Sequence, residues 1–295
     1  MGIANIPDFL YFRYITEVFM DKRLLTIQDI SCVGQCSLTV ALPVISACGI
    51  ETGVLPSSVL SNHTAGYSGW TFRDLTDDMP KILERWLIEK VDFDAFYTGY
   101  VSKAQIPHIL NIMEKTARKG AIRIVDPVMA DNGKLYAGFD DDFPQEMKKL
   151  CKGADVIIPN LTEAAFLLNQ PYVAEGYDKA FIEKMCKDLY ALGTKNVVLT
   201  GVSFDPTKLG VAVYDGKKTE YYFNEKQPVS SHGTGDLYAS VVAGSLLRGN
   251  SLLEAASLGA DVVVEAIKKT AGDKDHWYGV KFEQALPYLI KRLQK

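Results

Sequence analysis

The sequence predicts an α/β fold in which helices flank a mostly parallel central sheet. Short β-branched or apolar runs alternate with longer segments whose apolar residues recur at helical spacing, which is typical of βαβ units. Polar residues follow nearly every predicted strand, as expected where strands end at a ligand-binding edge. Late in the chain, two strand-like runs flank an Asp-Gly pair, which favours an antiparallel hairpin at one edge of the sheet.

The predicted elements follow one another without a break from residue 23 onward. Strands are expected at residues 24–28, 52–59, 95–97, 121–125, 156–158 and 196–199. Helices are expected near residues 36–48, 71–89, 104–118, 178–192, 236–248, 251–269 and 281–293. The hairpin comprises residues 210–214 and 219–223 on either side of Asp215-Gly216. Since no repeat or Pro/Ser-rich linker interrupts this order, residues 23–295 are predicted to form a single domain.

Residues 1–22 form a predicted N-terminal extension to this domain. They are rich in aromatic side chains, and Leu10, Tyr14 and Val18 recur at the spacing of an amphipathic helix. Charged residues interrupt the apolar run, which is not the pattern of a secretory signal. We therefore expect an appendage that the domain does not need.

Composition narrows the class of partner. The chain has 295 residues and a formal net charge of −4, with Lys and Arg scattered along it. This leaves no basic cluster for nucleic acid or an anionic membrane, so a small-molecule partner is favoured. No apolar stretch reaches the ~18 residues of a membrane span. The five cysteines have neither a zinc nor a thioredoxin-like spacing and are interpreted as reduced thiols, which indicates a cytoplasmic protein.

The sharpest motif is Gly233-Thr234-Gly235-Asp236, which directly precedes a helix-period run. Two glycines let the backbone aim several N–H groups at one point, and the helix N-terminus behind them adds partial positive charge. Phosphoryl transfer needs such an anion hole together with a base for the attacking hydroxyl, and Asp236 is placed to be that base. The alternative is an ordinary glycine-containing loop with an aspartate in the first helical turn.

A second motif places Asn160 and Glu163 three residues apart at a predicted helix start. Together they could hold the hydrated Mg²⁺ that accompanies ATP, because this ion keeps waters and takes few carboxylates directly. A capping box has the same spacing, so a purely structural role is equally open. Asp126 follows a predicted strand, and with Asp131 it could approach Mg²⁺ or the phosphates through water.

Further polar residues come directly after other predicted strands. Asp29 and Ser31 follow the first strand, Tyr100 follows the third, and Thr200 with Gly201 follows the sixth. Any one of them could be only a turn or cap residue. Because the carboxyl ends of parallel strands lie on one edge of a sheet, their joint position predicts a site there.

Taken together, these motifs resemble the ribokinase-like kinase superfamily over nearly the whole chain from Lys22. The resemblance implies a ribokinase-like three-layer sandwich, with helices on both sides of the central sheet. A further segment resembles the pyridoxal kinases in particular. The residues that carry the two resemblances are Asp126-Pro-Val-Met, Asn160-x-x-Glu163 and Gly-Thr-Gly-Asp236 for the superfamily, and Ser61-Asn62-His63-Thr64 with Thr98-Gly99-Tyr100 for the pyridoxal kinases.

The resemblance implies ATP-dependent phosphorylation of the 5′-hydroxyl of pyridoxal, pyridoxamine or pyridoxine. It also implies a homodimer, Mg²⁺ and a stimulatory monovalent cation such as K⁺. The implied roles are Asp236 as base, Thr64 and Tyr100 in the pyridine pocket, Thr200 and Gly201 at the nucleotide, and Glu163 orienting Mg²⁺ through water. From the residues themselves, the backbone of 233–236 is expected to cradle the phosphoryl group, and Tyr136, after Gly133, to help close the nucleotide side.

Two positions depart from the family pattern. Asp29 stands where the family often has Ser, which alters the expected substrate contact, and Ile158 stands where it often has Thr, which removes a possible phosphate contact. His63 and His232 are interpreted as structural or pocket-lining, since a carboxylate serves as base.

Two rival functions remain: a hydroxymethylpyrimidine kinase, whose relatives usually have Cys at the position of Asp236, and a non-catalytic B6-binding protein, which is expected to lose that base.

Overall fold

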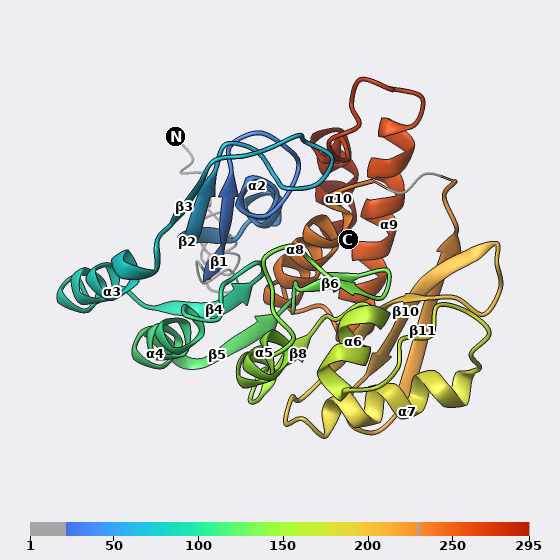
Figure 1. Ribbon diagram of the computed structural model, residues 1–295, viewed down its shortest axis with the longest axis horizontal. Helices are drawn as coiled ribbons and strands as arrows, with labels where there is room; N and C mark the ends of the chain where they lie inside the picture. The colour runs from blue at the N-terminus through green and yellow to red at the C-terminus, as the bar shows by residue number, and fades with distance from the viewer. Residues whose placement is uncertain (1–21, 229–230, 295) are drawn as a thin grey trace, which may run out of the picture.

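The computed structural model describes residues 22–228 and 231–294, in which a nine-stranded sheet lies between two layers of helices (Figure 1). The strand order is β11-β10-β9-β8-β5-β4-β1-β2-β3. From β9 to β2 the strands run parallel, while β10 and β11 at one edge and β3 at the other are antiparallel to their neighbours. The predicted α/β sandwich is confirmed. Apart from Lys22, the predicted N-terminal extension lies outside the described residues.

The strands of this sheet are β1 (Arg23–Ser31), β2 (Glu51–Leu60), β3 (Phe72–Asp74), β4 (Phe93–Thr98), β5 (Ala117–Val125), β8 (Val156–Ile157), β9 (Val197–Val202), β10 (Lys208–Tyr214) and β11 (Thr219–Glu225). The short strands β6 (Ala130–Asp131) and β7 (Lys134–Leu135) form a separate hairpin. The α-helices are α2 (Leu38–Ala47), α3 (Met79–Ile88), α4 (Ile106–Thr116), α5 (Phe143–Cys151), α6 (Leu161–Leu168), α7 (Lys179–Tyr190), α8 (Thr234–Leu247), α9 (Leu252–Thr270) and α10 (Leu286–Leu293). Two 3₁₀ turns are η1 (Thr76–Asp78) and η2 (Phe282–Gln284).

Apolar side chains on the two faces of the sheet form two buried clusters. On one face, Leu25 and Val125 belong to a cluster with side chains of α3, α4, α5, α6 and α7. On the other face, Leu24 and Ile124 belong to a cluster with side chains of α2, α8, α9 and α10. Because successive residues of a strand point to opposite faces, the near-continuous apolar runs of the central strands supply both layers.

The carboxyl ends of the parallel strands meet along one edge of the sheet. There the N–H of Asp126, just after β5, donates to the carbonyl of Thr98 at the end of β4 (3.0 Å). Farther along, the N–H of Thr200 donates to the carbonyl of Pro159 (2.9 Å), and a single bridge pairs Thr200 with Asn160. The polar residues predicted to follow the strands therefore share one rim.

The helix predicted over residues 71–89 is wrong in its first half. Residues 72–74 form β3, which pairs antiparallel with the end of β2, and the helix proper is α3. Asp74 Oδ1 accepts the N–H of Thr76 at 2.7 Å, which makes a tight turn after β3. Pro80 then lies in the first turn of α3, where a missing N–H costs no helical hydrogen bond.

The antiparallel hairpin is confirmed. Tyr214 pairs with Thr219, so residues 215–218 form the loop, as the predicted strand bounds imply. The side chain of Asp215 accepts the backbone N–H groups of Lys217 and Lys218, each at 2.9 Å, and these bonds stabilise the turn. The sequence pattern also does not predict α5 or the β6–β7 hairpin.

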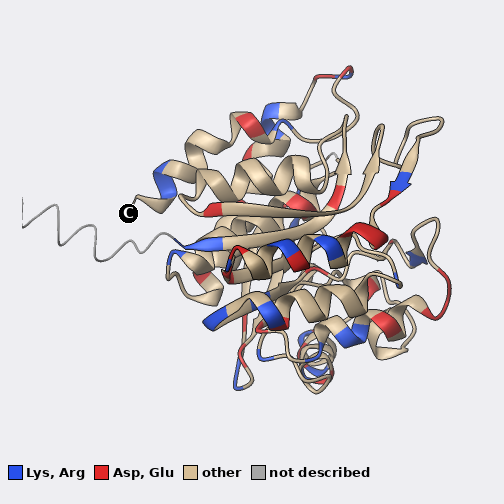
Figure 2. Ribbon diagram, turned by 90° about the vertical axis from the view of Figure 1, so that its left-hand side faces the viewer, with Lys and Arg blue, Asp and Glu red and all other residues tan. Residues whose placement is uncertain are grey.

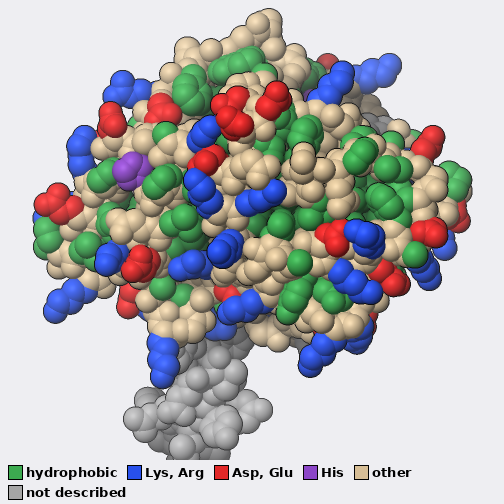
Figure 3. Space-filling view, turned by 60° about the horizontal axis from the view of Figure 1, so that its bottom comes forward, with side chains coloured by type: hydrophobic (Ala, Val, Ile, Leu, Met, Phe, Trp, Pro, Cys, Tyr) green, Lys and Arg blue, Asp and Glu red, His purple; other side chains and the backbone are tan. Residues whose placement is uncertain are grey.

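Charged side chains of both signs are interspersed on the surface. Figure 2 shows Lys and Arg among Asp and Glu along the helices, and Figure 3 shows the same mixture on another face. Among the described residues no helix is long and apolar enough to cross a membrane. The five cysteines are free thiols, as the sequence predicts.

Candidate active site

The Gly233-Thr234-Gly235-Asp236 loop packs against the loop between β1 and α2. Gly233 has a φ of 76°, and a Cβ there would lie 1.6 Å from the carbonyl oxygen of Gln35. Only glycine fits this position, because both the left-handed backbone and the close approach exclude a side chain. Helix α8 begins at the next residue, so its N-terminus and the backbone N–H groups of the loop form the predicted anion-binding end.

Asp236 lies in the first turn of α8 and is half-buried. Burial raises its pKa to about 7, and the charge of Asp29 adds to this effect. The backbone N–H of Ser37 hydrogen-bonds to the Asp236 carboxylate and acts in the opposite direction. A carboxylate with a pKa near neutrality is suited to accept a proton from an alcohol at that pH.

The predicted capping box at the start of α6 is present. Asn160 accepts the N–H of Glu163 (2.9 Å), and Glu163 Oε2 accepts the N–H of Asn160 (2.9 Å). The other carboxylate oxygen of Glu163 accepts the N–H of Met129 at 3.2 Å. Burial raises the pKa of Glu163 to about 8. The motif is thus a helix cap whose carboxylate is also fixed to the β5–β6 connection.

Asp126 lies close to both Glu163 and Asp236. Its side chain is buried, and burial together with the charges of those two acids raises its pKa well above the ordinary range. Tyr136 interacts electrostatically with the same three carboxylates and with Asp131. Asp131 is exposed, and its carboxylate accepts hydrogen bonds from Asn132. The structure therefore brings together acids that are far apart in the sequence.

Thr64 and Tyr100 line one pocket of about 470 Å³. The Tyr100 ring lies 5.2 Å from that of Phe139, measured between centroids. The apolar and aromatic side of this pocket was not predicted, because its residues come from the end of β2, from β3 and the residues before it, and from the start of α5 and the loop before it. These additional lining residues include Leu60, Trp70, Phe72, Phe139 and Phe143.

Asp29 lies near both Tyr100 and Asp236. Its side chain is 5% exposed, and its Oδ2 accepts the hydroxyl of Ser31 at 3.0 Å. Burial raises the pKa of Asp29, although hydrogen bonds from the Ser37 and Ser31 hydroxyls oppose this. Its charge raises the pKa of Tyr100 on the pocket side and that of Asp236 on the other.

His63 is held by the backbone through both ring nitrogens. Its Nε2 lies 2.7 Å from the carbonyl oxygen of Tyr278, and its Nδ1 accepts the N–H of Ala65 at 3.2 Å. A neutral ring with the proton on Nε2 satisfies both contacts. His63 is buried and His232 is exposed, with 5.5 Å between their ring centroids. The structural interpretation of His63 fits this arrangement.

Thr200 and Gly201 lie in β9, beside the start of α6. Gly201 has a φ of 80°, and no atom lies within 4 Å of the position its Cβ would take. The hydroxyl of Tyr177 donates to the carbonyl of Gly201 (3.5 Å) and accepts the N–H of Ser203 (3.0 Å). Tyr177 lies two residues before α7 and belongs to no motif, so no sequence pattern pointed to it.

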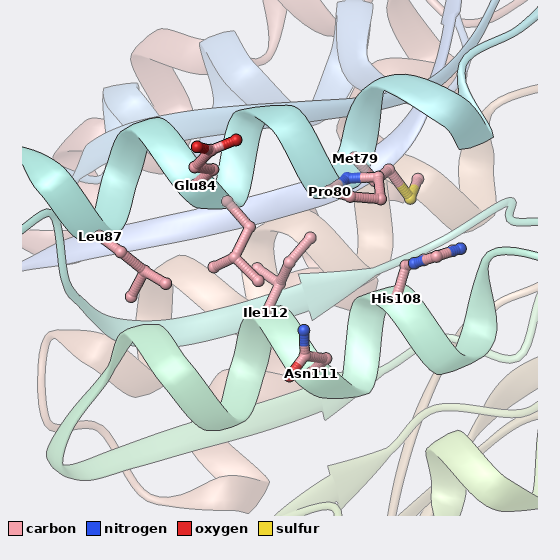
Figure 4. Close-up of a pocket in the computed structure, with 8 residues that line it drawn as sticks. Met79, Pro80, Glu84, Leu87, His108, Asn111 and Ile112 are labelled. Carbon is pink, nitrogen blue, oxygen red and sulfur yellow. The ribbon is translucent and has the colours of Figure 1, made fainter.

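A second pocket, of about 270 Å³, lies between α3 and α4. Leu87 of α3 and Ile112 of α4 point into it, and His108 and Asn111 lie along α4 (Figure 4). It contains none of the predicted site residues. The candidate site is the rim of the sheet, where Asp126 and Asp236 lie close to each other beside the glycine loop.

Comparison with known proteins shows which family the chain belongs to. The family model for phosphomethylpyrimidine kinase matches residues 49–279. The pyridoxal kinase of Dictyostelium discoideum is 29% identical over 247 residues, which cover 78% of this chain and 80% of that protein.

Two solved structures are similar over almost their whole length. The pyridoxal kinase of Lactobacillus plantarum is 33% identical with a TM-score of 0.84, covering 92% of this chain and 97% of that chain. A Bacteroides thetaiotaomicron protein, assigned to the phosphomethylpyrimidine kinases and crystallised with pyridoxal, is 37% identical with a TM-score of 0.85, covering 91% and 95%. This chain therefore belongs to the phosphomethylpyrimidine kinase family and, within the ribokinase-like superfamily, to its pyridoxal kinases.

Proposed function

We propose that this chain transfers the γ-phosphoryl group of ATP to the primary 5′-hydroxyl of pyridoxal, pyridoxamine or pyridoxine. The observation that carries the proposal is the position of Asp236, which lies behind a two-glycine loop at the N-terminus of α8 and has a pKa raised to about 7. The pyridoxal kinases among its relatives, and the Bacteroides protein crystallised with pyridoxal, support the same substrate class.

The proposed reaction is an in-line displacement. The 5′-oxygen attacks the γ-phosphorus, the bond from that phosphorus to the β,γ-bridging oxygen breaks, and ADP leaves. The proton of the hydroxyl passes to the carboxylate of Asp236. Backbone N–H groups of residues 233–236 stabilise the equatorial oxygens of the phosphoryl group. The pyridine ring occupies the pocket of Thr64 and Tyr100, with Asp29 beside it.

The nucleotide is proposed to lie on the other side of the glycine loop. Thr200 and Gly201 contact it from β9, where the open space around Gly201 leaves the backbone accessible. Tyr136 closes this side. Tyr136 is 41% exposed, and its backbone N–H donates to the carbonyl of Met129 (2.8 Å).

Mg²⁺ is proposed to enter with ATP, where it would neutralise phosphate charge. Among residues 22–228 and 231–294, no group of three or more His, Cys, Asp or Glu side chains could hold a metal ion by itself. That fits an ion that keeps its waters and takes most other ligands from phosphate. Asp126 would approach the ion, and Glu163, whose oxygens already accept two backbone N–H groups, would act through water.

A monovalent cation such as K⁺, a homodimer and a cytoplasmic location complete the proposal. The family resemblance implies the first two, and the reduced cysteines indicate the third. Titration of activity with KCl at constant ionic strength tests the first. Light scattering at assay concentration tests the second, and a mass of about 33 kDa instead of twice that would contradict it. Fractionation of cells that express the full chain tests the third.

A second candidate is a hydroxymethylpyrimidine kinase, because the matching family model is that of phosphomethylpyrimidine kinase. The aspartate at position 236 favours pyridoxal over pyrimidine substrates. A coupled assay of ADP formation, run with the three B6 vitamers and hydroxymethylpyrimidine, separates the two. The highest kcat/KM is expected for a B6 vitamer. A preference for the pyrimidine supports the second candidate, and ADP formation with none of the four supports a non-catalytic B6-binding protein.

A further inference from the structure

The ring of His63 lies where three segments distant in the sequence meet. A Cβ on Gly34 would overlap the imidazole, so only glycine lets the β1–α2 loop lie against the ring. In the same loop, the carbonyl of Val33 accepts the backbone N–H of His63 at 3.2 Å. The rings of Tyr67 and His232 lie 5.0 Å and 5.5 Å from that of His63, measured between centroids. His232 directly precedes the glycine loop, so His63 contacts segments from both sides of the candidate site.

The Nδ1 edge of the ring holds the turn that carries Thr64. Nδ1 accepts the N–H of Ala65 at 3.2 Å, so this bond spans Thr64. The side chain of Asn62 donates to the carbonyls of His63 and Gly69, each at 3.1 Å, and closes the turn from the other side. Thr64 lines the pocket proposed for the pyridine ring. The imidazole therefore fixes the backbone from which Thr64 reaches that pocket.

The Nε2 edge of the ring faces the connection between α9 and η2. Nε2 lies 2.7 Å from the carbonyl oxygen of Tyr278 and donates to it when the proton is on Nε2. The next residue, Gly279, packs against Gln35, since a Cβ on Gly279 would overlap the Gln35 side chain. The amide of Gln35 donates to Glu283 (3.0 Å), and its carbonyl lies against the glycine loop. This edge of the ring is thus linked to the glycine loop by direct contacts.

A continuous path of contacts therefore joins the pyridine pocket to the proposed phosphoryl cradle. It runs from Thr64 through His63 to residues 278–279, and from there through Gln35 to the glycine loop. In-line transfer needs the attacking oxygen close to the γ-phosphorus, and an error of about 1 Å can lower the rate about 100-fold. The distance between the two loops is therefore a catalytic requirement.

We propose that His63 is a positioning residue for phosphoryl transfer, which holds the turn of Thr64 in place relative to the glycine loop. The substrate hydroxyl then meets the phosphoryl group at the right distance. The inference rests on the proposed function, in which the pyridine ring binds beside Thr64. It also explains why the residue is histidine: a neutral imidazole accepts at one edge and donates at the opposite edge, as the two contacts require.

Two conservative variants separate the two edges of the ring. The amide of His63→Asn lies near the Nδ1 position, so it can accept the N–H of Ala65 but cannot reach Tyr278. The amide of His63→Gln lies near the Nε2 position, so it can donate to Tyr278 but leaves the N–H of Ala65 without its partner. Each variant therefore keeps one contact and loses the other.

The two variants are expected to affect different kinetic constants. His63→Asn should lower kcat with pyridoxal by roughly tenfold or more, with the KM for pyridoxal within about threefold, because the turn of Thr64 is kept and its link to the glycine loop is lost. His63→Gln should raise the KM for pyridoxal by roughly tenfold, with kcat within about threefold. Both should keep the KM for ATP within about twofold.

His108→Asn is the control, because His108 lies along α4 at the separate pocket, and it should keep all three constants. A kcat within about twofold of wild type in His63→Asn would overturn the inference. Equal changes of kcat and KM in His63→Asn and His63→Gln, with lowered melting temperatures, would also overturn it, because that pattern indicates general loosening of the loops.

Gln35→Ala tests the same path without changing His63. It removes the bond to Glu283 and part of the contact with Gly279, while the carbonyl against the glycine loop stays. Gln35 is half-buried, so the fold should tolerate the change even if the His63 variants do not fold. We expect kcat to fall by roughly fivefold or more with the KM for pyridoxal unchanged. An unchanged kcat would contradict the path.

NMR of the histidine rings tests the geometry apart from activity. The chain has four histidines, so the ¹⁵N signals of His63 can be assigned by their loss in His63→Gln. At pH 8 the ring is expected to be neutral with its proton on Nε2. A proton on Nδ1 would refute the inference. If the wild-type chain phosphorylates no B6 vitamer, the proposed function fails, whereas the spectrum still decides whether His63 joins the two loops.

Discussion

Replacing Asp236 with asparagine is expected to inactivate the enzyme and stabilise the fold at the same time. The side chain keeps its size and can still accept the N–H of Ser37, but it can no longer take a proton from the substrate. We expect kcat to fall by roughly 10²- to 10⁴-fold. Binding of ATP should persist, because the glycine loop and β9 are unchanged.

The expected gain in stability follows from the raised pKa. Burial raises the pKa of Asp236 from 3.8 to about 7. The folded state therefore holds a proton that the unfolded state loses, and wild-type stability falls as the pH rises from about 4 to about 7. Above pH 7 this loss amounts to at most about 4 kcal/mol, and solvent access to the half-buried side chain reduces it to about 2 kcal/mol. Asparagine avoids the loss, so the variant should be the more stable one at pH 8.

Two measurements test this reasoning. A coupled assay with pyridoxal and ATP gives kcat, and urea unfolding at pH 8 and near pH 4 gives the free energies of unfolding. The variant should gain stability at pH 8 and little near pH 4. Turnover near that of wild type would refute the assignment of the base. Equal or lower stability at pH 8 would refute the electrostatic account of the site.

Four further predictions follow from the site and the chain ends. Gly233→Ala should destabilise the fold by at least about 2 kcal/mol in urea unfolding, because its Cβ would meet the Gln35 carbonyl. Glu163→Gln should raise the Mg²⁺ concentration for half-maximal activity by roughly 10- to 100-fold. Asp29→Ser should lower kcat/KM by about tenfold for all three vitamers if the carboxylate meets the ring nitrogen, or for pyridoxamine alone if it meets the amine. A chain that begins at Met20 should keep its melting temperature and activity.

Each of these predictions has a control or a contradicting result. Gly235→Ala should fold as wild type, since no atom lies within 4 Å of the added Cβ. Glu254→Gln replaces the corresponding capping-box acid of α9, a helix that carries no residue of the proposed site, and should leave the Mg²⁺ requirement unchanged. A change of less than about twofold for every vitamer in Asp29→Ser would end the substrate-contact hypothesis. A large loss of melting temperature in the chain from Met20 would show that residues 1–19 belong to the core.

Much of the site was predictable because its parts are short and local. Gly233 to Asp236 are adjacent, and the constraints on a tight loop at a helix start depend on those residues alone. The spacing of Asn160 and Glu163 likewise predicted a helix start. The same spacing fits a capping box and a magnesium site, so the sequence could not choose between them. The structure shows the capping box. Tyr177 and Phe139 were missed, since their contacts come from segments distant in the sequence.

The sequence by itself determined the alternation of strands and helices, the glycine loop and the antiparallel hairpin, since each depends on residues a few positions apart. Only the tertiary structure decided the strand order and the edge strand β3, because pairing partners and register depend on packing across the sheet. It also decided that Asp29, Asp126 and Asp236 lie near one another. The raised pKa of Asp236 belongs with these features, because burial depends on the assembled layers and leaves no mark on local sequence.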